Sequence, residues 1–344
     1  MPLQYLPAEI LDNICHHAPL PDLVALSRTS SLFYTVTQRI LYRHISVDSK
    51  SLAVVLSLAK KPYVARHVRT FAIRIDPYTT VLNSYYRRLR EALSNMSELT
   101  SLDISVDPTA SWVLRMRSNV KFPRLQHFAS SFPLDSHVAH FLCRAEAIRQ
   151  LELDSFPISD PIALSSLPVT AIPQLSRFIG SSEAAQAVIP GRPVEEIHLN
   201  SGDMTEDVVR GLAKSTASVL LLGASTSSLP LSLLGTLAEF MPQLKYLRMM
   251  TTYNFLDAPD AVSLPINISK DPTLTSGISQ TFYQSTANAL ASLRNLHSFE
   301  LSGMHWGSSR KDLADEGRVW QSQPLEATPP TLDVVDLSDV YFAY

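Results

Sequence analysis

The residues of this chain best suited to chemistry are its histidines, cysteines and carboxylates, and their spacing argues against an enzyme. The pairs His16–His17 and His137–His140 have no cysteine or carboxylate partners at metal-ligand spacing, and the two cysteines stand far apart. The motifs G-x-S-x-G and H-E-x-x-H and the glycine-rich phosphate loops are absent, and the chain has only 10 glycines. We therefore expect a non-enzymatic protein with no cofactor and no metal site.

A second group of polar side chains lies between apolar residues in short phrases of the form L-x-x-L-x-L. If these phrases are strands, their apolar residues point to one face of a sheet and the intervening polar residues to the other. In four phrases the position between the last two apolar residues is acidic. Such a row of carboxylates could hold a basic peptide, or it could simply be the solvated face of a sheet. The candidate target-binding residues on this face are Arg74, Asp103, Glu152, His198, Arg248, Glu300 and Asp336.

The phrases that would position these residues recur along most of the chain. Their starts are mostly 19 to 31 residues apart, with one gap of 52, and leucine-rich repeats have periods of about 20–29 residues. Helix-like segments with one apolar face, such as 85–96 and 285–296, lie between them. The phrases, including the apolar run 219–222, cover residues 68–73, 99–104, 125–128, 148–153, 175–178, 194–199, 219–222, 244–249, 296–301 and 332–337.

The segment 67–344 resembles a degenerate leucine-rich-repeat solenoid, in which strands and helices alternate. The competing interpretation is an ordinary α/β domain. Two long insertions, 251–284 and 303–331, interrupt the pattern, and insertions of this kind usually form loops on one rim of a solenoid. Trp306 and Trp320 lie in the second insertion, where they either anchor the loop on the repeats or contact a partner.

The first 46 residues have a different pattern, which predicts three short amphipathic helices. Pro7 suits the first turn of a helix that carries Ile10 and Ile14 on one face. Asp22 can cap a second helix, and the serines at 30–31 can cap a third. A unit of about forty residues is too small to bury all these apolar stripes alone. Part of the apolar surface therefore faces either a partner or the domain that follows.

Residues 6–45, LPAEILDNICHHAPLPDLVALSRTSSLFYTVTQRILYRHI, resemble an F-box, and Leu6-Pro7-x-Glu9-Ile10-Leu11 is similar to the opening signature of that family. Many members have a tryptophan in the third helix, where Phe33 is the nearest aromatic residue here. In this family the unit binds the Skp-type adaptor of a Skp–cullin–F-box ubiquitin ligase. The resemblance therefore implies that adaptor, and through it a cullin, as partners. The residues that it assigns to adaptor binding are Leu6, Pro7, Ile10, Leu11, Leu23, Leu26 and Phe33.

Composition limits the remaining classes. The 344 residues are 45% hydrophobic and 18% charged, with a formal net charge of −3. No lysine- or arginine-rich run stands out, so we expect no basic face and no nucleic-acid partner. We find neither a secretory signal nor an apolar stretch of about 20 residues that could span a membrane. These features predict a protein of the cytoplasm, the nucleus or both, with no membrane partner.

The sequence thus predicts an α/β protein with three parts. These are an F-box-like domain of three helices at residues 1–46, a connecting helix at 47–66 and an irregular leucine-rich-repeat solenoid at 67–344. The predicted function is that of a substrate-recognition subunit of a Skp–cullin–F-box ubiquitin ligase, whose repeats bind an unknown target protein. The alternative is a scaffold outside any ligase, whose N-terminal helices only cap the solenoid.

Overall fold

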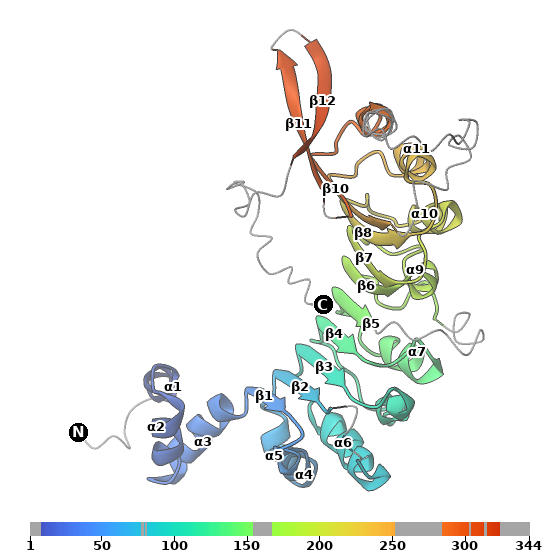
Figure 1. Ribbon diagram of the computed structural model, residues 1–344. Helices are drawn as coiled ribbons and strands as arrows, with labels where there is room; N and C mark the ends of the chain where they lie inside the picture. The colour runs from blue at the N-terminus through green and yellow to red at the C-terminus, as the bar shows by residue number, and fades with distance from the viewer. Residues whose placement is uncertain are drawn as a thin grey trace, which may run out of the picture.

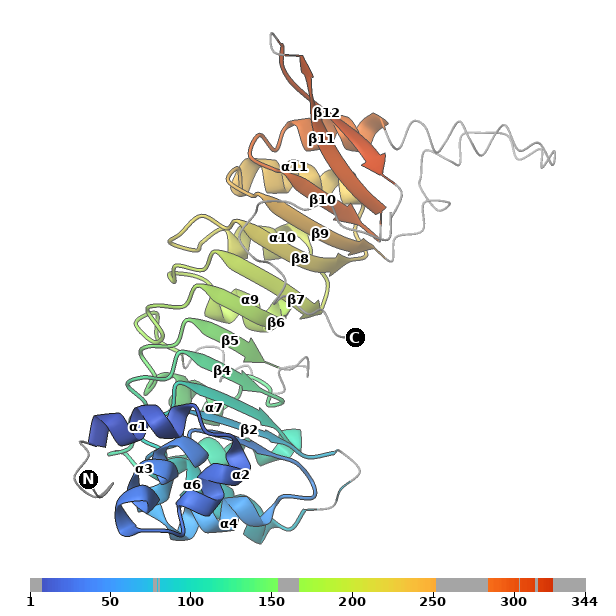
Figure 2. The same cartoon turned by 90° about the vertical axis from the view of Figure 1, so that its left-hand side faces the viewer.

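A computed structural model of the chain describes residues 8–76, 79, 81–153, 167–251, 284–302, 304–312 and 315–323. The fold is mixed α/β. A small N-terminal domain of three helices lies at one end of a long sheet, and the later helices lie along one face of that sheet (Figures 1 and 2). The described residues do not include Leu6, Pro7, Asp336, the phrase 332–337 or residues 252–283 of the first insertion.

The helices of the N-terminal domain are α1 (Ala8–His16), α2 (Leu20–Leu26) and α3 (Ser31–Leu41). Pro19 has an extended backbone and precedes α2, which has Pro21 in its first turn. The Ser30 hydroxyl accepts a hydrogen bond of 3.3 Å from the backbone N–H of Phe33 and caps α3, as expected. Asp22 is not the cap of the second helix, because that helix begins two residues earlier. Its carboxylate lies in the first turn of α2, where a negative charge favours the helix dipole.

Twelve strands of the described residues form one sheet, in which each strand pairs with the next along the chain. The pairs from β1 to β10 are parallel, and β11 and β12 add an antiparallel hairpin. Each of the nine phrases within the described residues forms a strand that begins two residues after its first apolar residue. The strands are β1 (His44–Val47), β2 (Thr70–Arg74), β3 (Ser101–Ser105), β4 (His127–Ser130), β5 (Gln150–Leu153), β6 (Arg177–Ser181), β7 (Glu196–Ser201), β8 (Leu221–Thr226), β9 (Tyr246–Thr251), β10 (Ser298–Leu301), β11 (Met304–Asp312) and β12 (Asp315–Gln323).

Helices connect the parallel strands and cover one face of the sheet (Figure 2). Side-chain caps begin four of them, each accepting a hydrogen bond from a backbone N–H in the first turn of the helix that follows. The capping residues are Asp107, Asp135, Ser181 and Thr205. A further helix, which has no label in Figure 1, covers 284–291 and overlaps the segment 285–296 that the sequence predicts to be helical. The others are α4 (Ala53–Lys60), α5 (Pro62–Ala65), α6 (Asn83–Asn95), the 3₁₀ helix η2 (Pro108–Leu114), α7 (Ser136–Leu142), α9 (Ser182–Val188), α10 (Glu206–Leu212) and α11 (Pro230–Phe240).

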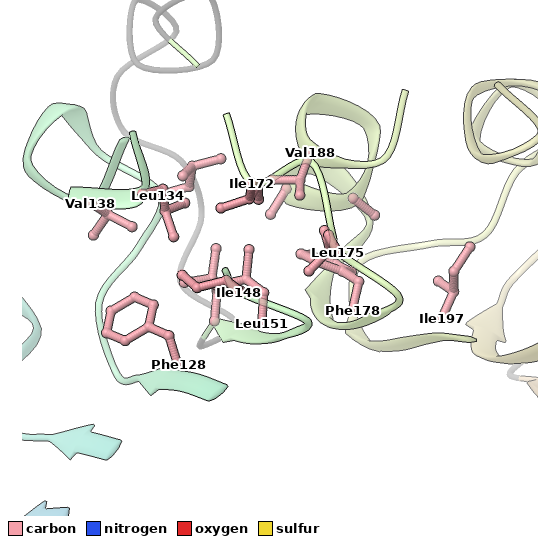
Figure 3. Packing of buried hydrophobic residues seen from close by; sticks show 14 of the residues in the cluster. Phe128, Leu134, Val138, Ile148, Leu151, Ile172, Leu175, Phe178, Val188 and Ile197 are labelled. Atoms are coloured by element: carbon pink, nitrogen blue, oxygen red, sulfur yellow. The ribbon is translucent and has the colours of Figure 1, made fainter. Parts of the chain in front are cut away.

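The core lies between the sheet and these helices. Its central row runs across the strands in register from Ile45 to Trp306, and every position in it is apolar. Figure 3 shows how Phe128, Leu151 and Phe178 of this row pack against side chains from the helical layer. The alternation of the phrases therefore places the apolar residues on the helix side and leaves the other face polar.

The structure differs from the predicted boundaries at both ends of the sheet. The strand β1 lies within the segment expected to be purely helical, and residues 47–66 form two helices whose side chains belong to the sheet core rather than to a connector. The insertion 303–331, expected as a loop, contains the hairpin β11–β12. Trp306 and Trp320 are buried at 2% and 4% exposure, which is the anchoring arrangement rather than the partner-contact one.

Candidate functional site

The N-terminal domain has a small apolar core of its own. Leu11 and Cys15 of α1, Leu23 of α2 and Val36 of α3 are at most 3% exposed and form a cluster that is separate from the core of the sheet. Leu26 and Phe33 pack against this cluster and are partly buried. The three helices therefore hold one another through these contacts and do not depend on the sheet to cover them.

Apolar side chains remain exposed on the outside of this domain. Ile10 and Ile14 of α1 are 47% and 48% exposed, and Leu20 and Val24 of α2 are 65% and 41% exposed. Each pair is spaced by four residues, so its two side chains share one face of their helix. We call these four residues the apolar helix face. Exposed apolar residues grouped in this way mark protein-interaction sites more often than isolated ones do.

The residues predicted to bind an adaptor divide into three groups. Ile10 is exposed, and Leu26 and Phe33 are partly exposed. Leu11 and Leu23 are buried in the core of the domain, so a direct contact with a partner is not available to them in this conformation. For these two, adaptor binding stays a prediction, and the structure places both side chains in the core of the domain. The same helical spacing serves both the core and the outer face.

The joint between the N-terminal domain and the sheet is polar. Arg39 donates a 2.9 Å hydrogen bond to the Asp12 carboxylate, and an Arg43 guanidinium nitrogen lies 3.4 Å from Nε2 of His16. These four residues, with Ile40, His67 and Arg69, line a crevice of about 260 Å³. Burial, together with nearby arginines, lowers the pKa of His67. Charged and polar side chains therefore line this crevice, while Tyr42 and Ile45 beside it pack against the core of the sheet.

Comparison with known families identifies this domain. A model of the F-box-like family matches residues 3–48. The three helices lie within the matched residues, and we call them the F-box-like domain after this similarity. The match extends over β1, so the F-box-like domain is continuous with the first strand of the sheet. A search of curated proteins finds none that matches the chain.

The exposed face of the sheet carries the other candidate residues. Five of them occupy one register row that crosses β3 to β10, and Arg74 lies at the end of the neighbouring strand β2. The F-box-like domain therefore lies at one end of this row. The five are Asp103, Glu152, His198, Arg248 and Glu300.

The predicted row of carboxylates is largely paired with arginines from adjacent strands. Arg74 lies 2.9 Å from Asp103, and Arg248 lies 3.2 Å from Glu300, whose side chain is only 9% exposed. Glu152 remains exposed. The register therefore brings a positive charge beside Asp103 and beside Glu300, which leaves less free negative charge for a basic peptide. Target binding by these residues stays a prediction.

His198 and Tyr246 are two partly buried side chains of this face. A Cβ atom at Gly223, the next residue in the row, would lie 2.6 Å from Nδ1 of His198, so the imidazole occupies the space above that glycine. Burial, and then Arg248 and Arg177, lowers the pKa of His198 to about 4. The Tyr246 hydroxyl donates a 3.3 Å hydrogen bond to Glu300, and burial raises the pKa of Tyr246 to about 12. Both side chains are therefore neutral near pH 7.

A second outward row was missed by sequence reasoning. It includes His127, Arg177, Glu196 and Tyr246, which lie in register at the starts of their strands. Arg177 and Glu196 are 3.6 Å apart. The sequence does contain the signal for this row. Side chains alternate along a strand, so in each phrase the residue just before the middle apolar residue points to the same face as the residue just after it.

The described residues contain neither a candidate metal cluster nor a helix that could span a membrane. No group of three or more histidine, cysteine, aspartate or glutamate side chains in that part of the chain could hold a metal ion. Among its helices, none is long and apolar enough to cross a membrane.

Proposed function

We propose that this chain is a substrate-recognition subunit of a Skp–cullin–F-box ubiquitin ligase. The single observation that carries the proposal is the F-box-like domain at residues 3–48, whose apolar helix face is left uncovered. F-box domains generally occur in adaptor proteins rather than enzymes. In this proposal the domain binds a Skp-type adaptor and, through it, a cullin.

The free energy available from burying the apolar helix face is large enough for a specific contact. Full burial of an isoleucine or valine side chain is worth about 1.5–3 kcal/mol, so a half-exposed one retains about 1 kcal/mol. Four such residues would contribute about 4 kcal/mol, or roughly a thousandfold in affinity. The buried residues Leu11 and Leu23 would support this surface from behind, and Leu26 and Phe33 would contribute at its edge.

We further propose that the sheet is a degenerate leucine-rich-repeat solenoid that holds the target protein. Strands that pair in chain order, the L-x-x-L-x-L phrases and a helical layer on one face all support this interpretation. The outward rows from β3 to β10 would form the target surface, with paired charges around the neutral His198 and Tyr246. Tethering would then raise the effective concentration of the target near the conjugating enzyme, and no bond would be made by this chain.

The alternative, a scaffold whose first helices cap the sheet, is less consistent with the geometry. A cap requires that the apolar residues of α1 and α2 be buried against the first strands. Instead Ile10 and Ile14 are exposed, and the two apolar cores are separate.

The test is a pull-down with purified Skp-type adaptor. We expect the wild-type chain to bind and the double variant Ile10→Asp/Ile14→Asp to lose at least about thirtyfold in affinity. The matched control is Leu82→Asp/Val169→Asp, which places the same charges at exposed apolar residues outside the F-box-like domain and should bind like the wild type. A folded wild-type chain that does not bind would contradict the proposal.

A further inference from the structure

Positive charge is concentrated in one part of the chain. Residues 60–124 contain 12 lysines and arginines but only 5 aspartates and glutamates, a net charge of +7, although the whole chain carries −3. The remaining residues therefore carry −10. The local excess does not appear as one basic run, which is why the sequence predicts no basic face.

Several of these arginines converge on two hollows that meet at Arg90 of α6. The first, of about 620 Å³, lies between α6, the end of α4, the start of α5 and the segment that follows η2. Arg90, Arg115 and Arg117 line it. The second, of about 520 Å³, is lined by Arg87, Arg90, Asn83 and Trp112. We call the two hollows together the arginine groove, with Arg87, Arg90, Arg115 and Arg117 as its charged residues.

The positive charge of the arginine groove is not compensated by neighbouring carboxylates. Among the described residues, Glu91 is the one acidic residue that lines either hollow, and Arg88 already holds it at 2.7 Å. Within the described part of the chain, none of the four arginines of the groove has a carboxylate within ion-pair distance. The Arg90 guanidinium lies 5.8 Å from the ring centroid of Trp112, a cation–π arrangement that orients it.

Hydrogen bonds from partly buried neighbours fix the walls of the groove. Arg144 donates to the backbone carbonyls of Met116 and Arg117 at 2.9 and 2.8 Å, which ties down the segment that carries Arg115 and Arg117. On the opposite wall, the Asn95 amide donates to the carbonyl of Ala59 at 3.2 Å and joins α6 to the end of α4. The arginines therefore extend from a backbone that needs no rearrangement to receive a ligand.

We propose that the arginine groove binds an acidic, carboxylate-rich segment of a partner protein. Guanidinium groups bind carboxylates through paired hydrogen bonds, and four of them along two joined hollows match an extended chain rather than a point charge. A nucleic-acid site with about 6–10 phosphate contacts would need more cations than these four arginines supply. The arginine groove includes no residue of the F-box-like domain or of the outward rows of the sheet, so binding there does not depend on the proposed function.

The test measures the fluorescence anisotropy of a labelled octaglutamate peptide titrated with the full chain at about 50 mM salt. We expect saturable binding that weakens steeply with added salt. Arg115→Glu/Arg117→Glu and Arg87→Glu/Arg90→Glu should each weaken it at least about tenfold, because the peptide occupies both hollows. The control Arg149→Glu/Lys214→Glu reverses two exposed charges elsewhere and should leave the affinity within about twofold.

The same titration can overturn the proposal. Arg115 and Arg117 are exposed, so that variant should fold like the wild type, and equal thermal melting curves would verify this. Unchanged peptide binding by both groove variants would exclude the groove as the site. Tighter binding of a single-stranded RNA, lost in the same variants, would replace the acidic peptide with a nucleic acid. Complete displacement by millimolar inorganic phosphate would indicate a site for a small anion.

Discussion

The F-box-like domain and the sheet treat their apolar residues in opposite ways. The sheet buries its inward rows against a layer of helices, and its outward face carries charges that are paired across strands. The helices of the F-box-like domain bury only four apolar side chains in their shared core. Of the eleven large hydrophobic residues exposed in the described part of the chain, five lie in α1–α3, although these helices occupy only residues 8–41. The described part of the sheet thus covers most of its own apolar residues, whereas the F-box-like domain leaves apolar area exposed.

The largest expected effect is in the sheet core. Phe128 is fully buried, and its ring centroid lies 4.8 Å from that of Phe141. Phe128→Ala should lower the free energy of unfolding by about 3–5 kcal/mol, because it removes the aromatic ring and leaves a cavity. Urea denaturation of the full chain measures this. A loss below about 1 kcal/mol would mean that the row is loosely packed, contrary to the comparison.

The next largest effect is expected at the Arg248–Glu300 pair on the outward face of the sheet. Arg248 neutralises Glu300, a carboxylate with only 7% of the residue exposed. Arg248→Met should cost about 2–3 kcal/mol of stability, since it leaves that charge buried with the Tyr246 hydroxyl as its remaining described partner. The same urea titration applies, and a neutral result would show that the pair is more solvated than its burial indicates.

The pH dependence of stability tests His198. Its pKa is lowered from 6.5 to about 4 in the folded state. Between these values the unfolded chain binds a proton that the folded chain does not, so stability is full above pH 6.5 and falls as the pH approaches 4. Chemical denaturation across this range should show a steeper fall for the wild type than for His198→Gln. Parallel curves for the two proteins would contradict the lowered pKa.

The smallest effect is expected at the Arg74–Asp103 pair. Arg74 is 77% exposed at its side chain, and exposed ion pairs contribute little because water and salt screen them. Arg74→Met should change stability by less than about 0.5 kcal/mol. A loss of stability as large as that of Arg248→Met would show that the exposed Arg74–Asp103 pair and the buried Arg248–Glu300 pair do not differ in strength.

The strands were predictable because their signal is local. Nine phrases of L-x-x-L-x-L type became nine strands with a constant offset. The strand β1 carries the same spacing in Tyr42, Ile45 and Val47, but an aromatic residue in the first position hid it. The hairpin β11–β12 was missed because its polar composition is typical of a loop. Backbone pairing, rather than an apolar pattern, defines these two strands.

The partners within the candidate sites could not be predicted, because they depend on register and on distant segments. Arg248 and Glu300 are 52 residues apart in the sequence and adjacent in the sheet. Arg90 and Arg117 converge only because η2 follows α6 and Arg144 holds the segment after η2. The apolar spacing of α1 is compatible with either core or surface, and only the structure separates Leu11 from Ile10.

The most direct test of the partner surface is hydrogen–deuterium exchange of the full chain with and without a Skp-type adaptor. If the apolar helix face is the contact, adaptor should slow exchange in α1 and α2 and leave β2 to β10 unchanged, because the two cores are separate. The same experiment with Ile10→Asp/Ile14→Asp should show no protection. Protection over residues 50–75 with none in α1 and α2, or none anywhere in a folded wild-type chain, would contradict the assignment of this face to the adaptor.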